Sequence, residues 1–176
     1  LAFELLAPEG DAVPASIQAN LCRLLARAAG HEGMAGGQAI DLASVGLALD
    51  EDALRRMHRM KTGALLQGSV EMGAVCGAPT PAVRDALRGY GAALGLAFQV
   101  VDDILDVTQD SATLGKTAGK DAAHDKPTYV SLLGLEPSRA YAEALLAQAL
   151  AALDASGLQN TDALRALAKM VVQRSS

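Results

Sequence analysis

Aromatic residues are scarce in this chain. Its 176 residues include no tryptophan, three tyrosines and two phenylalanines, although 51% of the residues are hydrophobic. A core with so few rings must be built mainly from alanine and leucine, the residues that favour closely packed helices. No segment shows the alternation of apolar and polar residues that predicts a half-buried strand. We therefore expect an all-α protein.

Several other features are missing. The formal net charge is −5, and the absence of a basic stripe argues against nucleic acid as a partner. No apolar run reaches the length of a membrane span, and the first residues show neither the basic lead nor the cleavage site of a signal peptide. The only two cysteines, Cys22 and Cys76, lie in apolar helical segments. We expect them to be reduced, buried thiols in a cytoplasmic protein.

Capping residues, prolines and glycines divide the chain into helices. Asp50, Thr80 and Thr161 stand at expected helix starts, and Pro81 opens the longest apolar pattern. The predicted helices cover residues 14–30, 31–49, 51–77, 81–107, 128–135, 137–156 and a last stretch after 161. We expect one domain, residues 1–176, formed by helices packed around a central cavity.

The most informative segment is Asp102-Asp103-Ile104-Leu105-Asp106, near the end of the longest predicted helix. On a helix, Asp102 and Asp106 project together, and Asp103 lies beside Asp106. Crowded carboxylates repel one another unless a cation lies between them. A solvated acidic face is the alternative for such a motif taken alone.

A polar segment follows the acids, and the loss of hydrophobic periodicity predicts a loop. It contains Lys116, Lys120 and Lys126. Carboxylates that bind a divalent cation, next to lysines that can meet phosphate oxygens, indicate a Mg²⁺–diphosphate site. The alternative is an ordinary charged surface loop.

Three motifs together resemble the trans-prenyl diphosphate synthases, most closely the bacterial short-chain farnesyl diphosphate synthases (geranyltranstransferases). The motifs are Gly36–Leu42 (GGQAIDL), His58–Leu65 (HRMKTGAL) and Phe98–Asp106 (FQVVDDILD) followed by Gly115-Lys116. The resemblance implies an isoprenoid synthase-type helical bundle and a prenyltransferase. Such an enzyme condenses an allylic diphosphate with isopentenyl diphosphate.

The resemblance also implies roles for individual residues. Gln38 and Asp41 would face the cavity near the allylic diphosphate. Lys61 would bind that diphosphate, and Thr62 would lie against the reacting centre.

Phe98 would stack beside the homoallylic substrate, and Gln99 would lie near the diphosphate and Thr62. Lys116 and Lys120 would hold the departing diphosphate.

Metal binding is implied by the same likeness. Asp102 would be a direct Mg²⁺ ligand, and Asp103 and Asp106 would act directly or through water. Mn²⁺ is a possible substitute.

Residue patterns alone leave other interpretations open. On spacing alone, the preferred interpretation of Lys61 is a surface lysine, and that of Thr62 is a threonine with no special role in the middle of a helix. Gly33 suits close packing of helices, and His58 with Arg59 suits the solvated face.

The chain departs from the family at one point. Nothing in it corresponds to the first aspartate-rich motif, since Glu4, Glu9, Asp11 and Glu32 are scattered. We therefore expect a C-terminal fragment that lacks the N-terminal helices and is inactive as a bare polypeptide. The family usually forms homodimers. A non-catalytic helical subunit of a synthase and a plain interaction domain remain alternatives, and terpene cyclases share the ionisation chemistry.

Overall fold

The structure is a computed structural model that describes residues 1–10, 12–112 and 127–174. Within these ranges the regular elements are all helical, as the sequence predicts. The helices are α1 (Ala2–Leu6), α2 (Ala15–Ala29), α3 (Met34–Ala43), α4 (Glu51–His58), η1 (Arg59–Gly63), α5 (Ala64–Cys76), α6 (Pro81–Ala112), α7 (Tyr129–Leu133), α8 (Leu135–Ala155) and α9 (Asp162–Gln173). None of the described helices is long and apolar enough to cross a membrane.

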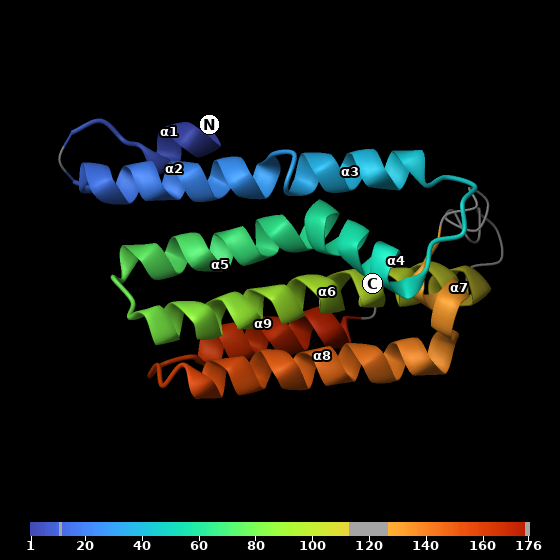
Figure 1. Cartoon of the computed structure of the whole chain (residues 1–176). Helices are drawn as coiled ribbons and strands as arrows, with labels where there is room; N and C mark the ends of the chain where they lie inside the picture. The colour runs from blue at the N-terminus through green and yellow to red at the C-terminus, as the bar shows by residue number, and fades with distance from the viewer. Residues whose placement is uncertain (11, 113–126, 175–176) are drawn as a thin grey trace.

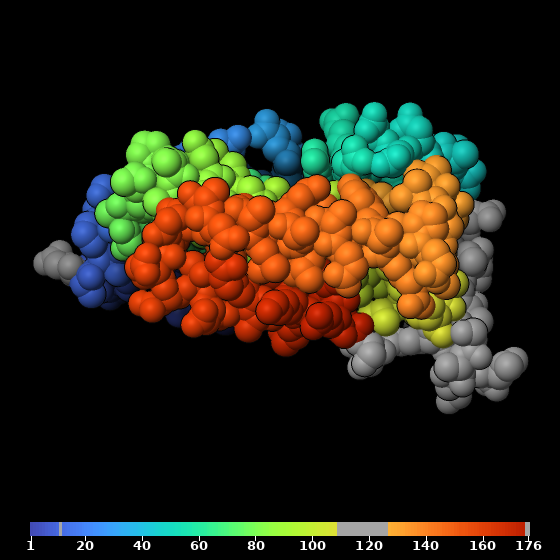
Figure 2. All heavy atoms as spheres, turned by 90° about the horizontal axis from the view of Figure 1, so that it is seen from below, coloured from blue at the N-terminus to red at the C-terminus, as the bar shows by residue number. Residues whose placement is uncertain are grey.

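The long helices lie in layers (Figure 1). α2 and α3 follow one another along the top of the view, and α5 packs between α2 and α6. α8 and α9 pack against α6 from the other side. Seen from below, α8 and α9 form most of the exposed surface (Figure 2). α6 is therefore the central helix, with neighbours on both sides.

Two capping predictions are confirmed. The backbone N–H of Ala53 donates to the Asp50 carboxylate over 2.8 Å, and that of Val83 donates to the Thr80 hydroxyl over 3.3 Å. Thr161 precedes α9 as predicted, but its hydroxyl accepts from the Arg165 side chain instead of from the backbone.

Several helix boundaries differ from the predicted ones. The helix predicted at 31–49 is reduced to α3. Gly30 is extended and Gly33 is also non-helical, which separates α3 from α2, and the helix ends at Ala43 before the positive φ of Gly46. The helix predicted at 51–77 is interrupted by a π-helical turn at residues 59–63. α8 begins at Leu135, before Pro137, since the first turn of a helix tolerates a proline that has no N–H to donate.

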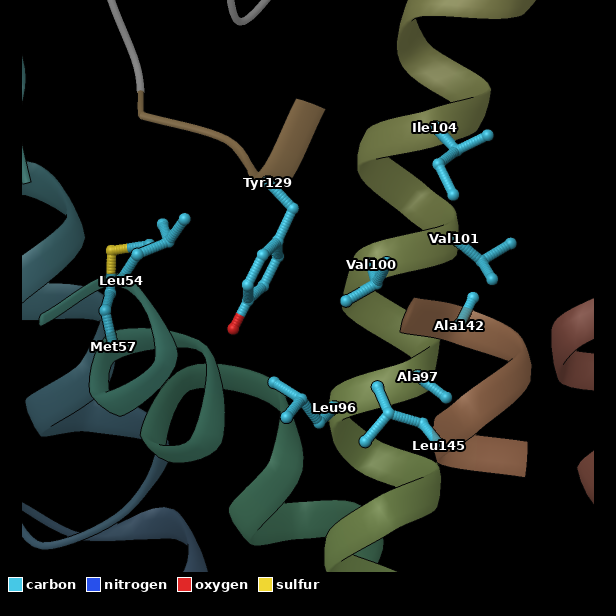
Figure 3. Close-up of a cluster of buried hydrophobic side chains, with 10 residues drawn as sticks. All are labelled: Leu54, Met57, Leu96, Ala97, Val100, Val101, Ile104, Tyr129, Ala142 and Leu145. Carbon is cyan, nitrogen blue, oxygen red and sulfur yellow. The ribbon is translucent and has the colours of Figure 1, made fainter. Parts of the chain in front are cut away.

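Two groups of buried side chains share α6. One lies toward the end of α6 and includes Leu54, Met57, Val100 and Tyr129; the other lies toward its start and includes Tyr90. Figure 3 shows the Tyr129 ring between the α4 side chains and α6. The first group packs directly beneath the acid-rich segment, so it fixes the position of that segment.

The prediction of buried thiols is wrong for Cys76 and only partly met for Cys22. Cys76 is exposed at the end of α5, and Cys22 is half-buried in α2. The helical period places Cys76 on the outer side, where the chain leaves α5 for the turn at Pro79.

Candidate functional site

The acid-rich segment Asp102–Asp106 belongs to α6, and its carboxylates meet different surroundings. The Asp102 side chain is 55% exposed, and its Oδ1 accepts from Arg174 Nη2 over 2.9 Å. Asp106 is half-buried, and Asp103 is only 3% exposed. Asp102 and Asp106 share one side of α6, whereas Asp103 is turned inward. Among the described residues, no three acidic, histidine or cysteine side chains converge as a metal cage would require.

Asp103 is the end of a chain of hydrogen bonds. Its Oδ2 accepts from the backbone N–H of Tyr129 over 2.8 Å, and its Oδ1 accepts from Gln99 Nε2 over 3.2 Å. The Oε1 of Gln99 in turn accepts from the Thr62 hydroxyl over 3.1 Å. These bonds join η1, α6 and the first residue of α7. Two of the residues predicted to be catalytic, Thr62 and Gln99, are therefore in direct contact.

Lys61 lies against α3. Its Nζ is 2.6 Å from Oδ2 of Asp41, a carboxylate that is almost fully buried. Gly37 makes this approach possible, because a Cβ there would lie 2.2 Å from the backbone nitrogen of Lys61. Gln38, the other polar residue predicted on this helix, is half-buried. The structure thus brings Lys61 and Asp41 together through backbone contact between two helices.

Lys61 and Thr62 occupy a π-helical turn, Arg59–Gly63, between α4 and α5. Such a turn inserts an extra residue, changes the direction of a helix and is frequent at functional sites. The change of direction is visible in Figure 1. Gly63 is pressed against Gly95 of α6, where an added Cβ would lie 2.7 Å from the Cα of Gly63. The turn is therefore held tightly on both sides.

His58 is a site residue that the sequence prediction assigned wrongly to the solvated face; its neighbour Arg59 is exposed, as predicted. The imidazole is 4% exposed, stacks on Tyr129 and places Nε2 3.9 Å from Asp103 Oδ2. Neither ring nitrogen has a well-aligned hydrogen bond among the described residues. The sequence did contain a signal for this position. His58 lies three residues before Lys61, and residues three apart share a face of a helix.

Burial sets the charge of this imidazole. It lowers the pKa of His58 to about 4, the ammonium of Lys61 acts in the same direction, and the Asp41 carboxylate opposes both. His58 is thus neutral near pH 7, and it adds no positive charge beside Asp103.

Arg174 is a second residue that sequence reasoning did not assign. Its guanidinium lies 4.1 Å from the centre of the Phe98 ring, and its Nη2 donates to the Phe98 carbonyl over 2.9 Å as well as to Asp102. Because 72 residues separate Arg174 from Asp102, no local pattern indicates the contact. Phe98, predicted to stack on substrate, is half-buried beneath this cation.

The remaining predicted residues lie outside the described part of the chain. Lys116 and Lys120 belong to residues 113–126, as does Lys126. Their contribution stays a prediction.

The described groups include the chemical kinds that a metal-bound anion requires. Asp102 offers an accessible carboxylate, Lys61 and Arg174 offer cations, and Thr62 with Gln99 offers neutral polar groups. One or two carboxylates, completed by phosphate oxygens and water, are the ligands that Mg²⁺ prefers. The set therefore fits a metal–diphosphate ligand.

Comparisons with known proteins identify the family of the chain. A family model described as polyprenyl synthetase matches residues 1–169. The chain is 54% identical over 133 residues to a protein of Bradyrhizobium diazoefficiens named "Probable farnesyl diphosphate synthase", covering 73% of this chain and 40% of that protein. It is 47% identical over 154 residues to the farnesyl diphosphate synthase of Escherichia coli, covering 86% and 52%.

A solved structure has the same fold. The geranyltransferase of Helicobacter pylori, complexed with magnesium and isoprenyl diphosphate, superposes with a TM-score of 0.77 at 34% identity, covering 97% of this chain and 55% of that one. The chain spans about half the length of the relatives it matches. With the family model matched along nearly all of its residues, the chain belongs to the polyprenyl synthetase family.

Proposed function

We propose that this chain forms part of a prenyltransferase that condenses an allylic diphosphate with isopentenyl diphosphate. The observation that carries the proposal is the hydrogen-bonded chain from Thr62 through Gln99 to Asp103. It connects the turn that bears Lys61 to the acid-rich end of α6. In this proposal Lys61 is the cationic group for the leaving diphosphate and the acid-rich segment is the source of carboxylates for a metal ion, and this hydrogen-bonded connection supports it.

Mg²⁺ would be held by Asp102, with Asp106 on the same side of α6 directly or through water, and Mn²⁺ could replace it. Asp103 is the third predicted ligand, and its carboxylate is turned into the protein interior. When bound, the metal would neutralise charge that develops on the leaving diphosphate. Arg174 would have to share or release Asp102 in that state.

The reaction is an ionisation followed by an alkylation. The bond from the allylic carbon to the diphosphate oxygen breaks, and its electron pair leaves with pyrophosphate. The double bond of isopentenyl diphosphate then attacks the allylic cation, and a proton is lost from the adduct.

The residues of this chain would act by charge and position. Lys61, Lys116 and Lys120 would donate to the diphosphate as negative charge develops, the kind of contribution that electrostatic catalysis depends on. Gln38 and Asp41 would border the allylic diphosphate, with Asp41 orienting Lys61 through the observed ion pair.

Three further residues would lie close to the reacting groups. Thr62 would face the reacting carbons, Gln99 would lie near the diphosphate and Thr62, and Phe98 would border the homoallylic substrate. Oxygen atoms directed at an allylic cation stabilise it, and exclusion of water protects it from hydrolysis.

The acidic motifs in the sequence bear on whether the chain can turn over substrate by itself. Its 176 residues contain one aspartate-rich motif, and we infer that turnover needs acids from a further segment or a further chain. The bare polypeptide would bind a metal–diphosphate without turning it over. Farnesyl diphosphate as the product, a cytoplasmic location, a homodimer and a single domain over residues 1–176 are part of the same proposal.

Calorimetric titration of pyrophosphate into the chain, with and without Mg²⁺, tests the site. Binding should require Mg²⁺ and should be lost in Asp102→Ala. Asp85→Ala is the matched control, because Asp85 is an exposed aspartate of the same helix, with a side chain 72% exposed. Binding that ignores Mg²⁺, or that is unchanged in Asp102→Ala, would contradict the proposal and favour a non-catalytic helical subunit or an interaction domain.

A further inference from the structure

The three aspartates of the acid-rich segment divide between two faces of α6. Asp102 is exposed, whereas Asp103 is buried and accepts hydrogen bonds from Gln99 and from the backbone of Tyr129. A carboxylate already engaged by two N–H donors in the protein interior is poorly placed to bind a metal ion directly. Its position calls for a different role.

The chemistry of an ionised carboxylate fixes the direction of the hydrogen-bonded chain. A carboxylate accepts hydrogen bonds only, so the amide NH₂ of Gln99 must face Asp103. The amide oxygen of Gln99 must then face the opposite way, toward Thr62. The Thr62 hydroxyl consequently donates its proton to Gln99 and keeps its lone pairs for whatever lies on its other side.

Neighbouring groups hold Asp103 in this orientation. The Tyr129 N–H is part of the backbone and can only donate, at 2.8 Å from Oδ2. The imidazole of His58, stacked on Tyr129, closes the same side of the carboxylate at 3.9 Å. Oδ1 is thereby left directed at Gln99.

We propose that Asp103 is a positioning residue, whose carboxylate orients the Gln99 amide so that Thr62 presents an acceptor oxygen to the substrate. The proposal rests on the function proposed above, in which Thr62 faces the reacting carbons. An allylic cation next to an oxygen lone pair is stabilised, whereas a hydroxyl proton directed at that cation would repel it. Asp103 therefore acts on the reaction through two other side chains.

Asp103→Asn tests the direction of the chain with almost no change of shape. The Tyr129 N–H still requires an acceptor, so the Asn oxygen must take the place of Oδ2 and the Asn NH₂ must face Gln99. Two NH₂ groups cannot pair, and the Gln99 amide should therefore rotate by half a turn. Thr62 would then accept from Gln99, and its proton would be free to point the other way.

Nuclear magnetic resonance of the side-chain amide of Gln99 reads this rotation directly. In the wild-type chain, the amide protons of Gln99 should show strong cross-relaxation with the β protons of Asp103 and weak cross-relaxation with the Thr62 methyl group. In Asp103→Asn the strong signal should move to the Thr62 methyl group. Asp102→Asn, the matched change on the exposed face, should retain the wild-type pattern.

Calorimetry with Mg²⁺ and pyrophosphate separates a positioning role from a ligand role. Asp103→Asn should bind within about twofold of wild type. Asp102→Asn should bind at least about tenfold more weakly, because loss of even an outer-shell partner of a metal ligand typically costs about 10–100-fold in affinity. Equal losses in both variants would make Asp103 a metal ligand and overturn the proposal.

The remaining outcomes are also decisive. Amide protons that already face Thr62 in the wild-type chain would overturn the proposal without any variant, even if Asp103→Asn failed to fold. An orientation of the Gln99 amide that does not change in Asp103→Asn would also overturn the proposal. Absence of pyrophosphate binding to wild type would refute the proposed function alone, because the orientation of Gln99 is measured without ligand.

Discussion

Replacing Gly37 by alanine should separate the two helices that position Lys61. The added Cβ would lie 2.2 Å from the backbone nitrogen and 2.6 Å from the Cα of Lys61, and 2.7 Å from the carbonyl carbon of Met60. These are backbone atoms of a π-helical turn that Gly95 holds from the opposite side. Rotation of a side chain cannot relieve the clash, so α3 must move away from η1.

The expected magnitude combines two opposing effects. Alanine gains about 1 kcal/mol over glycine in a helix interior, while overpacking against rigid neighbours costs 1–3 kcal/mol and sometimes more. Since the clash in Gly37→Ala involves several backbone atoms, we expect an overpacking cost above the usual range, about 4 kcal/mol, and therefore a net loss of roughly 3 kcal/mol. For a chain of this size each kcal/mol shifts the melting temperature by about 2–4 °C, so the melting temperature should fall by about 6–12 °C.

Gly73→Ala is the matched control. Gly73 lies within α5, and a Cβ there would meet no atom within 4 Å. Only the helix propensity remains, and the melting temperature should rise by about 2–4 °C. Differential scanning calorimetry of both variants measures the contrast, and Mg²⁺-dependent pyrophosphate binding should weaken only in Gly37→Ala. A Gly37→Ala chain that melts at or above the wild-type temperature would refute the close contact between α3 and η1.

Three further predictions concern buried or paired groups. The pKa of His58 is about 4 in the folded chain against 6.5 in a model peptide, so unfolding takes up a proton between these values; stability should fall by about 3 kcal/mol from pH 7 to pH 4. Urea titrations at several pH values measure how the free energy of unfolding changes with pH. That dependence should be weaker in His58→Gln than in the wild-type chain. Tyr90→Phe removes the 2.8 Å hydrogen bond that the tyrosine hydroxyl donates to the Leu164 carbonyl. Urea unfolding should show a loss of about 0.5–1.5 kcal/mol, the net contribution of one hydrogen bond, because the half-buried acceptor remains part of α9. An unchanged stability would contradict that bond. Arg174→Gln removes a competing cation from Asp102 and should tighten binding of Mn²⁺ alone by up to about fivefold, since exposed ion pairs contribute 1 kcal/mol or less; weaker Mn²⁺ binding would contradict the competition.

The sequence predicted the helices because their signals are local. Asp50 and Thr80 cap helices as expected. The apolar spacing of the longest helix holds as far as Leu105, but the helix continues past the predicted end at Val107 to Ala112 through polar residues that carry no such signal. The interruption at 59–63 could not be predicted, because a π-helical turn arises from backbone contacts with Gly37 and Gly95 on other helices. Patterns of one segment carry no information about such contacts.

Contacts between distant segments also explain which parts of the site could not be predicted. The resemblance paired Gln99 with Thr62, and the structure places them in hydrogen-bond contact. The burial of Asp103 depends on the backbone of Tyr129, 26 residues later. The partner of Asp102 is Arg174 near the other end of the chain. Helical spacing describes which residues share a face, but not which element covers that face.

The length of α6 has a consequence for how the chain opens. This single helix of 32 residues, about 48 Å long, runs through both groups of buried side chains. Neither group can come apart locally without exposing a part of the helix that the other group still holds. Amide protons in the middle of α6, near Gly95, should therefore exchange with solvent only when the whole chain unfolds. The acid-rich end of the helix is in this way secured by side chains at its far end.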